Sequence, residues 1–257
     1  MNPTLDTLNN LRSIHGDFSD RSIAAQDIET ILETATRAAN ASNRQSYSIV
    51  VVDDPEMMKQ LTGYQGSHLL LFCVDFNRLA ATAAHLGHEY TLRGVTPFLT
   101  GAIDTSLAAQ TAAIAAKSLG IDSLFTNGIH RGDIQRVYNL LKLPEKHCFP
   151  LIALILGYPA QDNEPKALRG RLTGPGVLHH GTYHMATDEE LQAIIAAYDD
   201  PSTELGRPAP WKEKGFDHFL DWFFEVWSKR APVSDGRSQL FQRLIDAGFL
   251  EGENIDV

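Results

Sequence analysis

Three polar side chains of different types stand close together near the amino terminus, in the stretch LNNLRSIHGDF of residues 8–18. Arg12 offers a guanidinium, Ser13 a hydroxyl and His15 an imidazole. A guanidinium keeps its charge and presents paired donors that match a phosphate, and a hydroxyl adds another donor. These residue types predict a site for a phosphate monoester, provided that a turn or distant cations complete it.

A second pair of cations, Arg169 and Arg171, lies in LRGRL, inside the proline- and glycine-rich stretch of residues 157–177. Stretches of this kind often wrap a ligand. If the two groups meet in the fold, they form the two halves of a phosphate clamp. The alternative is that these cations belong to a solvated basic face.

Other signatures of catalysis are missing from the sequence. It contains no G-x-G-x-x-G after a strand, no G-x-x-x-x-G-K-[ST] and no G-x-S-x-G. Cys73 and Cys148 have no neighbouring cation that would favour a thiolate, so we expect both in the core.

Histidines occur in two clusters that could in principle bind a metal ion: HLGHE, with His85, His88 and Glu89, and HHGTYH, with His179, His180 and His184. The first reads H-x-x-H-E in place of the zincin order H-E-x-x-H, and the second has no cysteine or carboxylate at supporting spacing. We therefore expect surface or loop histidines and no metal. A metal-dependent hydrolase remains as an alternative.

Composition limits the class of protein. The formal net charge of −10 argues against nucleic acid as a partner, and no apolar run approaches the span of a bilayer. A hydrophobic share of 43% is ordinary for a globular chain of 257 residues. The two cysteines provide no disulfide framework, and the first residues do not resemble a secretory signal. We expect a cytoplasmic protein built around one elaborated domain.

Hydrophobic periodicity predicts alternating helices and strands. Helices are expected over residues 28–39, 100–121 and 134–141, and strands over 47–53, 69–76, 123–129 and 149–159. The two strands at 47–53 and 69–76 are expected to be fully buried. The alanine-rich helix is expected to end at Gly120 and, because its residues are small all round, to lie buried at a crowded centre. The order of elements predicts an α+β fold.

The last third of the chain is expected to be almost wholly helical. Within it, residues 216–230 carry an aromatic face of Phe216, Phe219, Leu220, Phe223 and Trp227. Such a face packs either on a partner or on the core of its own domain, and the sequence leaves both possibilities open.

Several of these segments, taken in order, resemble those of a known family. Residues 11–52, LRSIHGDFSDRSIAAQDIETILETATRAANASNRQSYSIVVV, resemble the opening of the nitroreductase family of FMN-dependent oxidoreductases. FCVDFNR, GAIDTSLAAQTAAIAAKSLGI, LLKLPE, LGYP and RGRL…LHHGTY follow in the family's order and are similar to its larger, NADPH-preferring nitroreductases and flavin reductases. The resemblance covers about residues 8–200.

The resemblance implies a nitroreductase-like α+β fold, with a central mixed or antiparallel sheet flanked by helices. It implies an FMN-binding domain over residues 1–200, and a helical extension over 201–257 that packs on the core or on a dimer partner. A homodimer with flavins at the subunit interface is implied as well, which would give the aromatic helix a partner.

The resemblance also assigns cofactor-binding residues. Those on the FMN phosphate and ribityl side would be Arg12, Ser13, His15, Arg169 and Arg171. Those along the edge of the ring would be Ser42, Asn43, Gln45 and Gln65, and those whose backbone approaches the isoalloxazine would be Thr126, Asn127 and Gly128.

Two departures from the family pattern affect this site. Leu11 and His15 replace the basic residues that usually open and close the first motif, respectively, and Asn127–Gly128 keeps one glycine where the family has two. Because a neutral imidazole holds an anion less firmly than arginine, flavin affinity is expected to be lower or pH-dependent.

The implied function is an FMN-dependent oxidoreductase that takes hydride from NADPH or NADH and reduces nitroaromatics, quinones or free flavins by a ping-pong mechanism. The flavin carries the chemistry, so no side chain is assigned as a catalytic acid or base. Arg207 could meet the 2′-phosphate of NADPH or simply be solvated. A protein of the same fold that binds FMN without turnover, as a sensor or storage module, is the alternative.

Overall fold

The computed structural model describes residues 2–92, 94–160, 168–174, 176–206, 209–230 and 239–250. The chain forms two compact units, one of residues 1–164 and 236–257 and one of residues 165–235. The domain boundary expected at residue 200 therefore falls inside the second unit, and the end of the chain belongs to the first.

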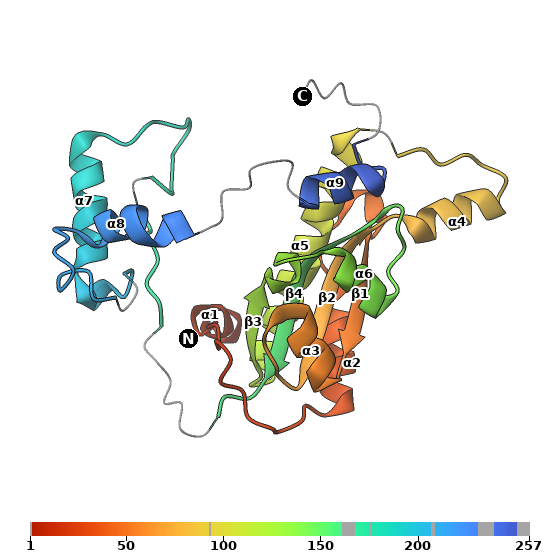
Figure 1. The fold of residues 1–257 in the computed structure, drawn as a ribbon, viewed down its shortest axis with the longest axis horizontal. Helices are drawn as coiled ribbons and strands as arrows, with labels where there is room; N and C mark the ends of the chain where they lie inside the picture. The colour runs from red at the N-terminus through yellow and green to blue at the C-terminus, as the bar shows by residue number, and fades with distance from the viewer. Residues whose placement is uncertain are drawn as a thin grey trace. The chain divides into compact units, whose positions relative to one another are not determined.

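The first unit is an α+β assembly around a sheet (Figure 1). Its helices are α1 (Pro3–Asn9), α2 (Ala25–Ala35), α3 (Pro55–Thr62), α4 (Asn77–His85), α5 (Val95–Ser118), α6 (Gln135–Leu141) and α9 (Gln239–Asp246). Its strands are β1 (Tyr47–Val52), β2 (His68–Asp75), β3 (Asp122–Thr126) and β4 (Cys148–Gly157). Among the described residues these strands form one antiparallel sheet in the order β1-β2-β4-β3, and each lies where the sequence predicts a strand.

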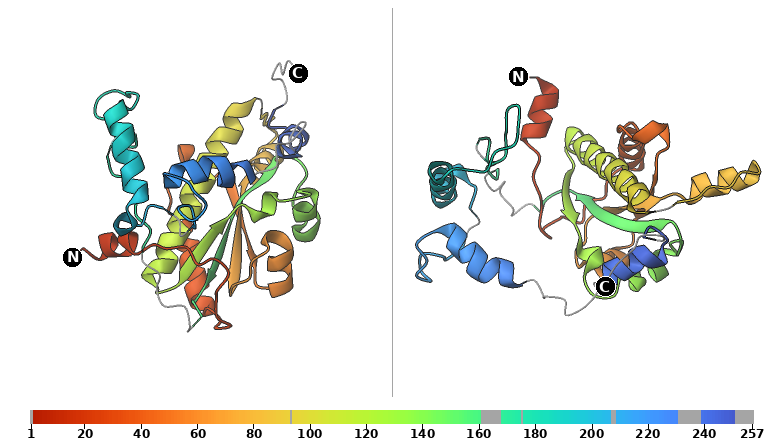
Figure 2. Two further views of the ribbon diagram at one scale, coloured as in Figure 1. Left: turned by 60° about the vertical axis from the view of Figure 1, so that its left-hand side comes forward. Right: turned by 90° about the horizontal axis from the view of Figure 1, so that it is seen from above.

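Helices cover both faces of this sheet, as strand β2 shows most clearly. Leu69 and Leu71 enter a core cluster shared with α3 and α6, whereas Leu70 and Phe72 enter a cluster shared with α2 and α5. Successive side chains of a strand point to opposite faces, so a strand that is apolar throughout must be covered twice. Figure 2 shows α5 on one side of the sheet and α3, α6 and α9 on the other. Cys73 and Cys148 are buried and unpaired, as predicted.

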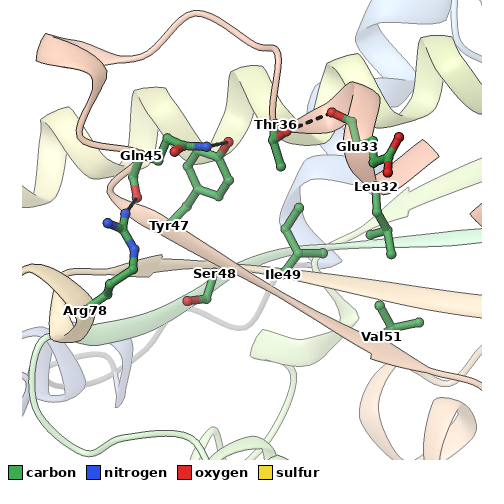
Figure 3. A pocket seen from close by; sticks show the side chains of 9 residues that line it. All are labelled: Leu32, Glu33, Thr36, Gln45, Tyr47, Ser48, Ile49, Val51 and Arg78. Atoms are coloured by element: carbon green, nitrogen blue, oxygen red, sulfur yellow. Dashed lines mark hydrogen bonds between the residues drawn. The ribbon is translucent and has the colours of Figure 1, made fainter. Parts of the chain in front are cut away.

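Strand β1 is less buried than the sequence predicted. It lies at the edge of the sheet, and Val51 keeps 41% of its surface exposed. The reason is a hollow of about 440 Å³ between β1 and α2, lined by Leu32 on the helix, by Thr36 just after it, and by Ile49 and Val51 on the strand (Figure 3). An apolar edge strand and a buried strand give the same residue pattern, so the sequence could not separate them.

Helix α5 is buried on one face only. The helix ends just before Gly120, which has a positive φ of 76° as expected of a terminating glycine. Its alanines pack on the sheet, but Leu99, Ile103 and Leu107 are 53%, 60% and 42% exposed. The prediction that the whole helix is buried is therefore wrong. Small residues let this helix approach the sheet closely, and the large apolar residues are left on the opposite face.

The second unit contains α7 (Asp188–Asp199), α8 (Phe219–Trp222), a π-helical turn η4 (Phe223–Trp227) and the short 3₁₀ turns η3 (Pro201–Thr203) and η5 (Ser228–Arg230). The His218 Nδ1 atom lies 2.6 Å from Asp199 Oδ2, and the Tyr198 and Phe219 rings stack 5.9 Å apart. These contacts join α7 to α8. The predicted helical carboxyl-terminal part is confirmed. Between these helices, and from 168 to 186, the described residues are loops and turns, so the last third is less helical than the sequence predicted.

The aromatic residues of the second unit divide into two groups. Phe219 and Trp222 are buried within the unit, whereas Phe224 is 58% and Trp227 39% exposed. The inner part of the aromatic face thus packs on its own unit. Packing on its own domain was one of the two possibilities that the sequence left open.

Helix α9 is held on the first unit by Arg243. Its guanidinium donates to a Glu145 carboxylate oxygen at 2.6 Å and lies over the ring of Tyr138. Phe249 packs against Phe76 and Phe98. Within the described part of the chain, no helix is long and apolar enough to cross a membrane.

Candidate functional site

The opening segment runs extended along strand β3. The Ile14 amide donates to the Ser123 carbonyl oxygen at 3.0 Å, and Ser13 pairs with Ser123 as an isolated parallel bridge. Alternate residues of an extended chain face opposite ways. Accordingly Ile14 is buried, while Ser13 and His15 are exposed on the other face. A hydroxyl and an imidazole are thus presented together.

Arg12 does not share that exposed face. Its Nε and one terminal nitrogen donate to Asp122 Oδ2 at 3.2 and 2.7 Å, and Lys117 Nζ donates to Asp122 Oδ1 at 2.8 Å. Burial by itself would raise the pKa of Asp122, but the hydrogen bonds from Arg12 and Lys117 outweigh it and the pKa lies below its usual value. Two of the three guanidinium nitrogens of Arg12 are therefore engaged by a carboxylate, which differs from the predicted contact with a phosphate.

The loop that carries Gln65 lies beside the opening segment. A Cβ added to Gly16 would lie 3.6 Å from the Tyr64 ring, and the Ile23 amide donates to Ser67 Oγ at 2.9 Å. Gln65 itself is partly buried. The structure thus places this glutamine in the neighbourhood of the opening segment, and its contact with the flavin ring stays a prediction.

The segment Thr126–Gly128 begins at the last residue of β3 and packs on the end of α3. A Cβ on Gly128 would lie 2.4 Å from the Thr62 carbonyl oxygen, so only glycine fits there, and its amide donates to Thr126 Oγ1 at 3.0 Å. Thr126 and Gly128 are buried and Asn127 is exposed. The remaining glycine of the predicted pair therefore serves close packing on α3, and Asn127 is the residue that solvent reaches.

The turn of Ser42, Asn43 and Gln45 lies elsewhere. All three residues have φ between 50° and 54°, which is rare for residues other than glycine. The buried Asp104 carboxylate of α5 stabilises the turn by accepting from the Ala41 amide at 2.9 Å.

Arg78 holds the same turn from outside, because its guanidinium donates to the carbonyl oxygens of Arg44 and Gln45 at 2.7 and 2.8 Å. Figure 3 shows the bond to Gln45. Gln45 and Arg78 also line the hollow beside β1. The turn is thus fixed on both sides by side chains distant in sequence.

Strand register separates this turn from the opening segment. The turn leads into Tyr47, which pairs with Val74 and, through it, with Phe149, whereas Ser123 beside the opening segment pairs with Leu156. Seven residue steps of β4 lie between Phe149 and Leu156, which corresponds to about 23 Å at roughly 3.3 Å per residue. One chain therefore does not bring its own Ser42, Asn43 and Gln45 to its own Ser13 and His15.

Arg169 and Arg171 lie in the second unit. Arg169 donates to the Gly206 carbonyl oxygen at 2.8 Å, and Arg171 donates to the carbonyl oxygens of Arg169 and Gly170 at 3.0 and 2.8 Å. Both side chains are exposed. Their meeting with Ser13 and His15 stays a prediction, and Arg207 lies outside the described residues.

The histidine clusters do not assemble a metal centre in the part of the chain that the structure describes, where no group of three or more histidine, cysteine, aspartate or glutamate side chains could hold an ion. His179 and His184 approach each other, with 3.4 Å between their Nδ1 atoms. His85 and His88 are exposed.

Sequence reasoning missed Asp104, Asp122 and Arg78, which hold the predicted site residues in place. The signal for the two aspartates was present, because each is an acidic residue next to apolar residues in an otherwise uncharged stretch. A buried carboxylate needs partners, so such residues are candidates for fixing neighbouring segments. Arg78, on the exposed side of α4, gave no comparable signal.

Comparison with known proteins identifies the family. A family model described as the nitroreductase family matches residues 10–71. An FMN reductase (NADPH) of Bacillus subtilis is 34% identical over 217 residues, which cover 80% of this chain and 84% of that protein. The chain belongs to the nitroreductase family.

Further relatives agree with this family assignment. An oxygen-insensitive NADPH nitroreductase of Salmonella typhimurium is 35% identical over 214 residues, covering 79% of this chain and 82% of that protein. The solved NADPH:FMN oxidoreductase from Vibrio harveyi, complexed with NAD+, resembles this nitroreductase with a TM-score of 0.76 at 26% identity, covering 97% of this chain and 100% of that one. The family and the α+β fold predicted from the sequence are confirmed.

Proposed function

We propose that this nitroreductase is an FMN-dependent enzyme that oxidises NADPH or NADH and passes the electrons to nitroaromatics, quinones or free flavins in a ping-pong cycle. The observation that carries the proposal is the opening segment, which presents Ser13 and His15 on one exposed face in a chain whose relatives are named FMN reductases and NADPH nitroreductases. NADPH is the expected donor, since the relatives' names mention it repeatedly.

The first unit presents hydrogen-bond donors of the types that bind a phosphate monoester. Ser13 offers a hydroxyl and His15 an imidazole, and both are exposed. Because two guanidinium nitrogens of Arg12 are engaged by Asp122, permanent positive charge at the phosphate would have to come from other residues; the resemblance assigns this role to Arg169 and Arg171, and the assignment stays a proposal.

Bound FMN would supply the hydride chemistry, and this chain's residues would bind and orient it. Gln65 and the backbone of Thr126–Gly128 would border the ring. Ser42, Asn43 and Gln45 would approach a ring from the turn fixed by Asp104. Donors near the ring would stabilise negative charge that develops on reduction.

We also propose a homodimer. Leu99, Ile103 and Leu107 recur at four-residue spacing and form an exposed apolar stripe on α5. A second copy covering this stripe would bury it. Because the turn of residues 42–45 and the opening segment lie at opposite ends of the sheet, two copies would also let the turn of one chain complete the site of the other.

The decisive experiment is a spectroscopic titration. The purified protein should be yellow or take up added FMN, and anaerobic NADPH should bleach the flavin absorbance, with NADH tested beside it. Adding a quinone or nitroaromatic should restore the absorbance, and initial rates should give the parallel double-reciprocal lines of ping-pong turnover.

Two outcomes would contradict the proposal. A protein that takes up no FMN is not a flavoenzyme. FMN binding without bleaching by either nicotinamide would favour the sensor or storage alternative.

The expected cellular compartment is the cytoplasm, consistent with the two unpaired thiols. Fractionation of cells, followed by detection with an antibody, would test it.

A further inference from the structure

The cluster of Arg12, Asp122 and Lys117 carries a role that the family resemblance does not give it. Resemblance places Arg12 at the FMN phosphate, but its guanidinium faces the start of β3. Asp122 is 5% exposed and accepts hydrogen bonds from both cations, at 2.7 Å from Arg12 and 2.8 Å from Lys117. This arrangement fixes three segments together: the opening segment, strand β3 and the end of helix α5.

The opening segment has few other attachments to the fold, and near its end the Asp17 carbonyl oxygen accepts from the Ala160 amide at 2.9 Å. Between α1 and Phe18, the Ile14 amide bonds to Ser123 and the Ile14 side chain is buried. The fork from Arg12 to Asp122 adds two charge-assisted hydrogen bonds on the same inward face as Ile14. Locking the inward residues sets which way the next residues point, so Ser13 and His15 must face outward together.

We propose that Asp122 is a positioning residue for the cofactor's phosphate: it holds Arg12, and through it orients Ser13 and His15. Arg12 is then an anchor and not itself a phosphate ligand. This inference rests on the proposed binding of FMN.

The substitution Asp122→Asn separates positioning from simple electrostatics, because the two predict opposite results. The variant removes a negative charge beside the phosphate site and leaves one neutral acceptor oxygen for two cations, so electrostatics alone predicts equal or tighter FMN binding. Positioning predicts weaker binding, by about tenfold, because a charge-assisted fork is lost.

Riboflavin binding distinguishes a positioning role from a general structural defect, because such a defect would weaken the binding of both flavins. It has the same ring system as FMN and lacks the phosphate. Both ligands are titrated by quenching of flavin fluorescence into apoprotein prepared from the full chain. In Asp122→Asn, FMN affinity should fall about tenfold while riboflavin affinity stays within about twofold of the wild type.

Two further variants complete the design. Arg12→Lys keeps the charge but cannot form the fork, so it should lose FMN affinity in the same direction, and it serves if Asp122→Asn does not fold. Glu56→Gln is the matched control, because it removes a carboxylate from the exposed ion pair with Lys59 on α3, and both affinities should be unchanged.

Unchanged or tighter FMN binding by folded Asp122→Asn would overturn the inference, and so would an equal loss for FMN and riboflavin. If Asp122→Asn does not fold, the same results for Arg12→Lys overturn it. Failure of the wild type to bind either flavin would instead refute the proposed function, and the inference with it, so the two failures are distinguishable.

Discussion

At the scale of single residues, the exposed basic side chain of the opening segment is His15, since Arg12 donates to Asp122. His15→Arg should therefore bind FMN at least as tightly as the wild type, because arginine keeps its charge and offers paired donors. Fluorescence titration measures this, with the exposed His88→Arg as the control that adds the same charge elsewhere. A clear loss of affinity in His15→Arg would count against the phosphate assignment.

Asp122 also predicts how stability responds to acid. Its pKa is lower in the folded protein than the ordinary carboxyl value of about 4. The unfolded chain therefore takes up a proton first as the pH falls. The stabilisation is fully present above about pH 4, the unfolded value, and is lost as the pH falls through the lower, folded one.

Asp122→Asn should cost about 2 kcal/mol at neutral pH, less than for a fully buried pair because Arg12 and Lys117 are partly exposed. Urea unfolding at pH 7 and below pH 4 should show the wild type losing more stability on acidification than the variant. Equal losses would refute the role of this carboxylate.

Residue types alone predicted a phosphate site, and alternation along an extended segment accounts for the shared face of Ser13 and His15. The partner of Arg12 was out of reach, because Asp122 is 110 positions away and only the pairing of the segment with β3 brings them together. Local sequence shows which side chains could bind a ligand. It does not show which of them the fold has already paired.

At the scale of elements, strands β2 and β4 and the carboxyl end of α5 were predictable, because apolar runs and the glycine after the helix are local signals. The helix begins at Val95, five residues before the predicted start. The faces of α5 were not. Alanines and large aliphatic residues alternate around this helix, and only contact with the sheet decides that Ala108 and Ala112 turn inward while Ile103 and Leu107 turn outward.

Asp104 on the inner face of α5 should stabilise the turn of residues 41–46, since it accepts from the amides of Ala41 and Ser46. Asp104→Ala should lower the free energy of unfolding by about 2 kcal/mol, because those buried amides lose a charged acceptor. Urea denaturation measures this. Ser106→Ala, at an exposed position of the same helix, is the control and should change it by less than about 0.5 kcal/mol. Equal effects of the two substitutions would refute the role of Asp104.

At the scale of the whole molecule, the first boundary between the two units falls inside the proline- and glycine-rich stretch of residues 157–177, but the return of the chain to the first unit followed no local signal. The boundary expected at residue 200 falls between α7 and the segment that packs on it, where Asp199 binds His218. The end of the chain returns to the first unit through Arg243 and Glu145. Both are long-range contacts of exposed or charged residues, which hydrophobic periodicity does not report.

The whole molecule is proposed to act as a homodimer. In the proposed homodimer, the apolar stripe of Leu99, Ile103 and Leu107 lies in the interface. Ile103→Glu would bury an unpaired charge there and should give a monomer. Because the turn of residues 42–45 is displaced from the opening segment by about 23 Å along the strands at 3.3 Å per residue, a monomer would have only part of the site and should release FMN.

Light scattering coupled to size exclusion, with flavin absorbance recorded across the peak, measures mass and FMN content together. Gln60→Glu is the control, since it adds the same charge at an exposed position of α3, and it should stay dimeric and yellow. Two results would refute the shared site: a wild type that is monomeric and holds FMN, or an Ile103→Glu monomer that keeps its full flavin content. In either case a single chain would supply every contact with FMN. Because Ser42, Asn43 and Gln45 lie far from the opening segment of their own chain, these three residues would then take no part in binding.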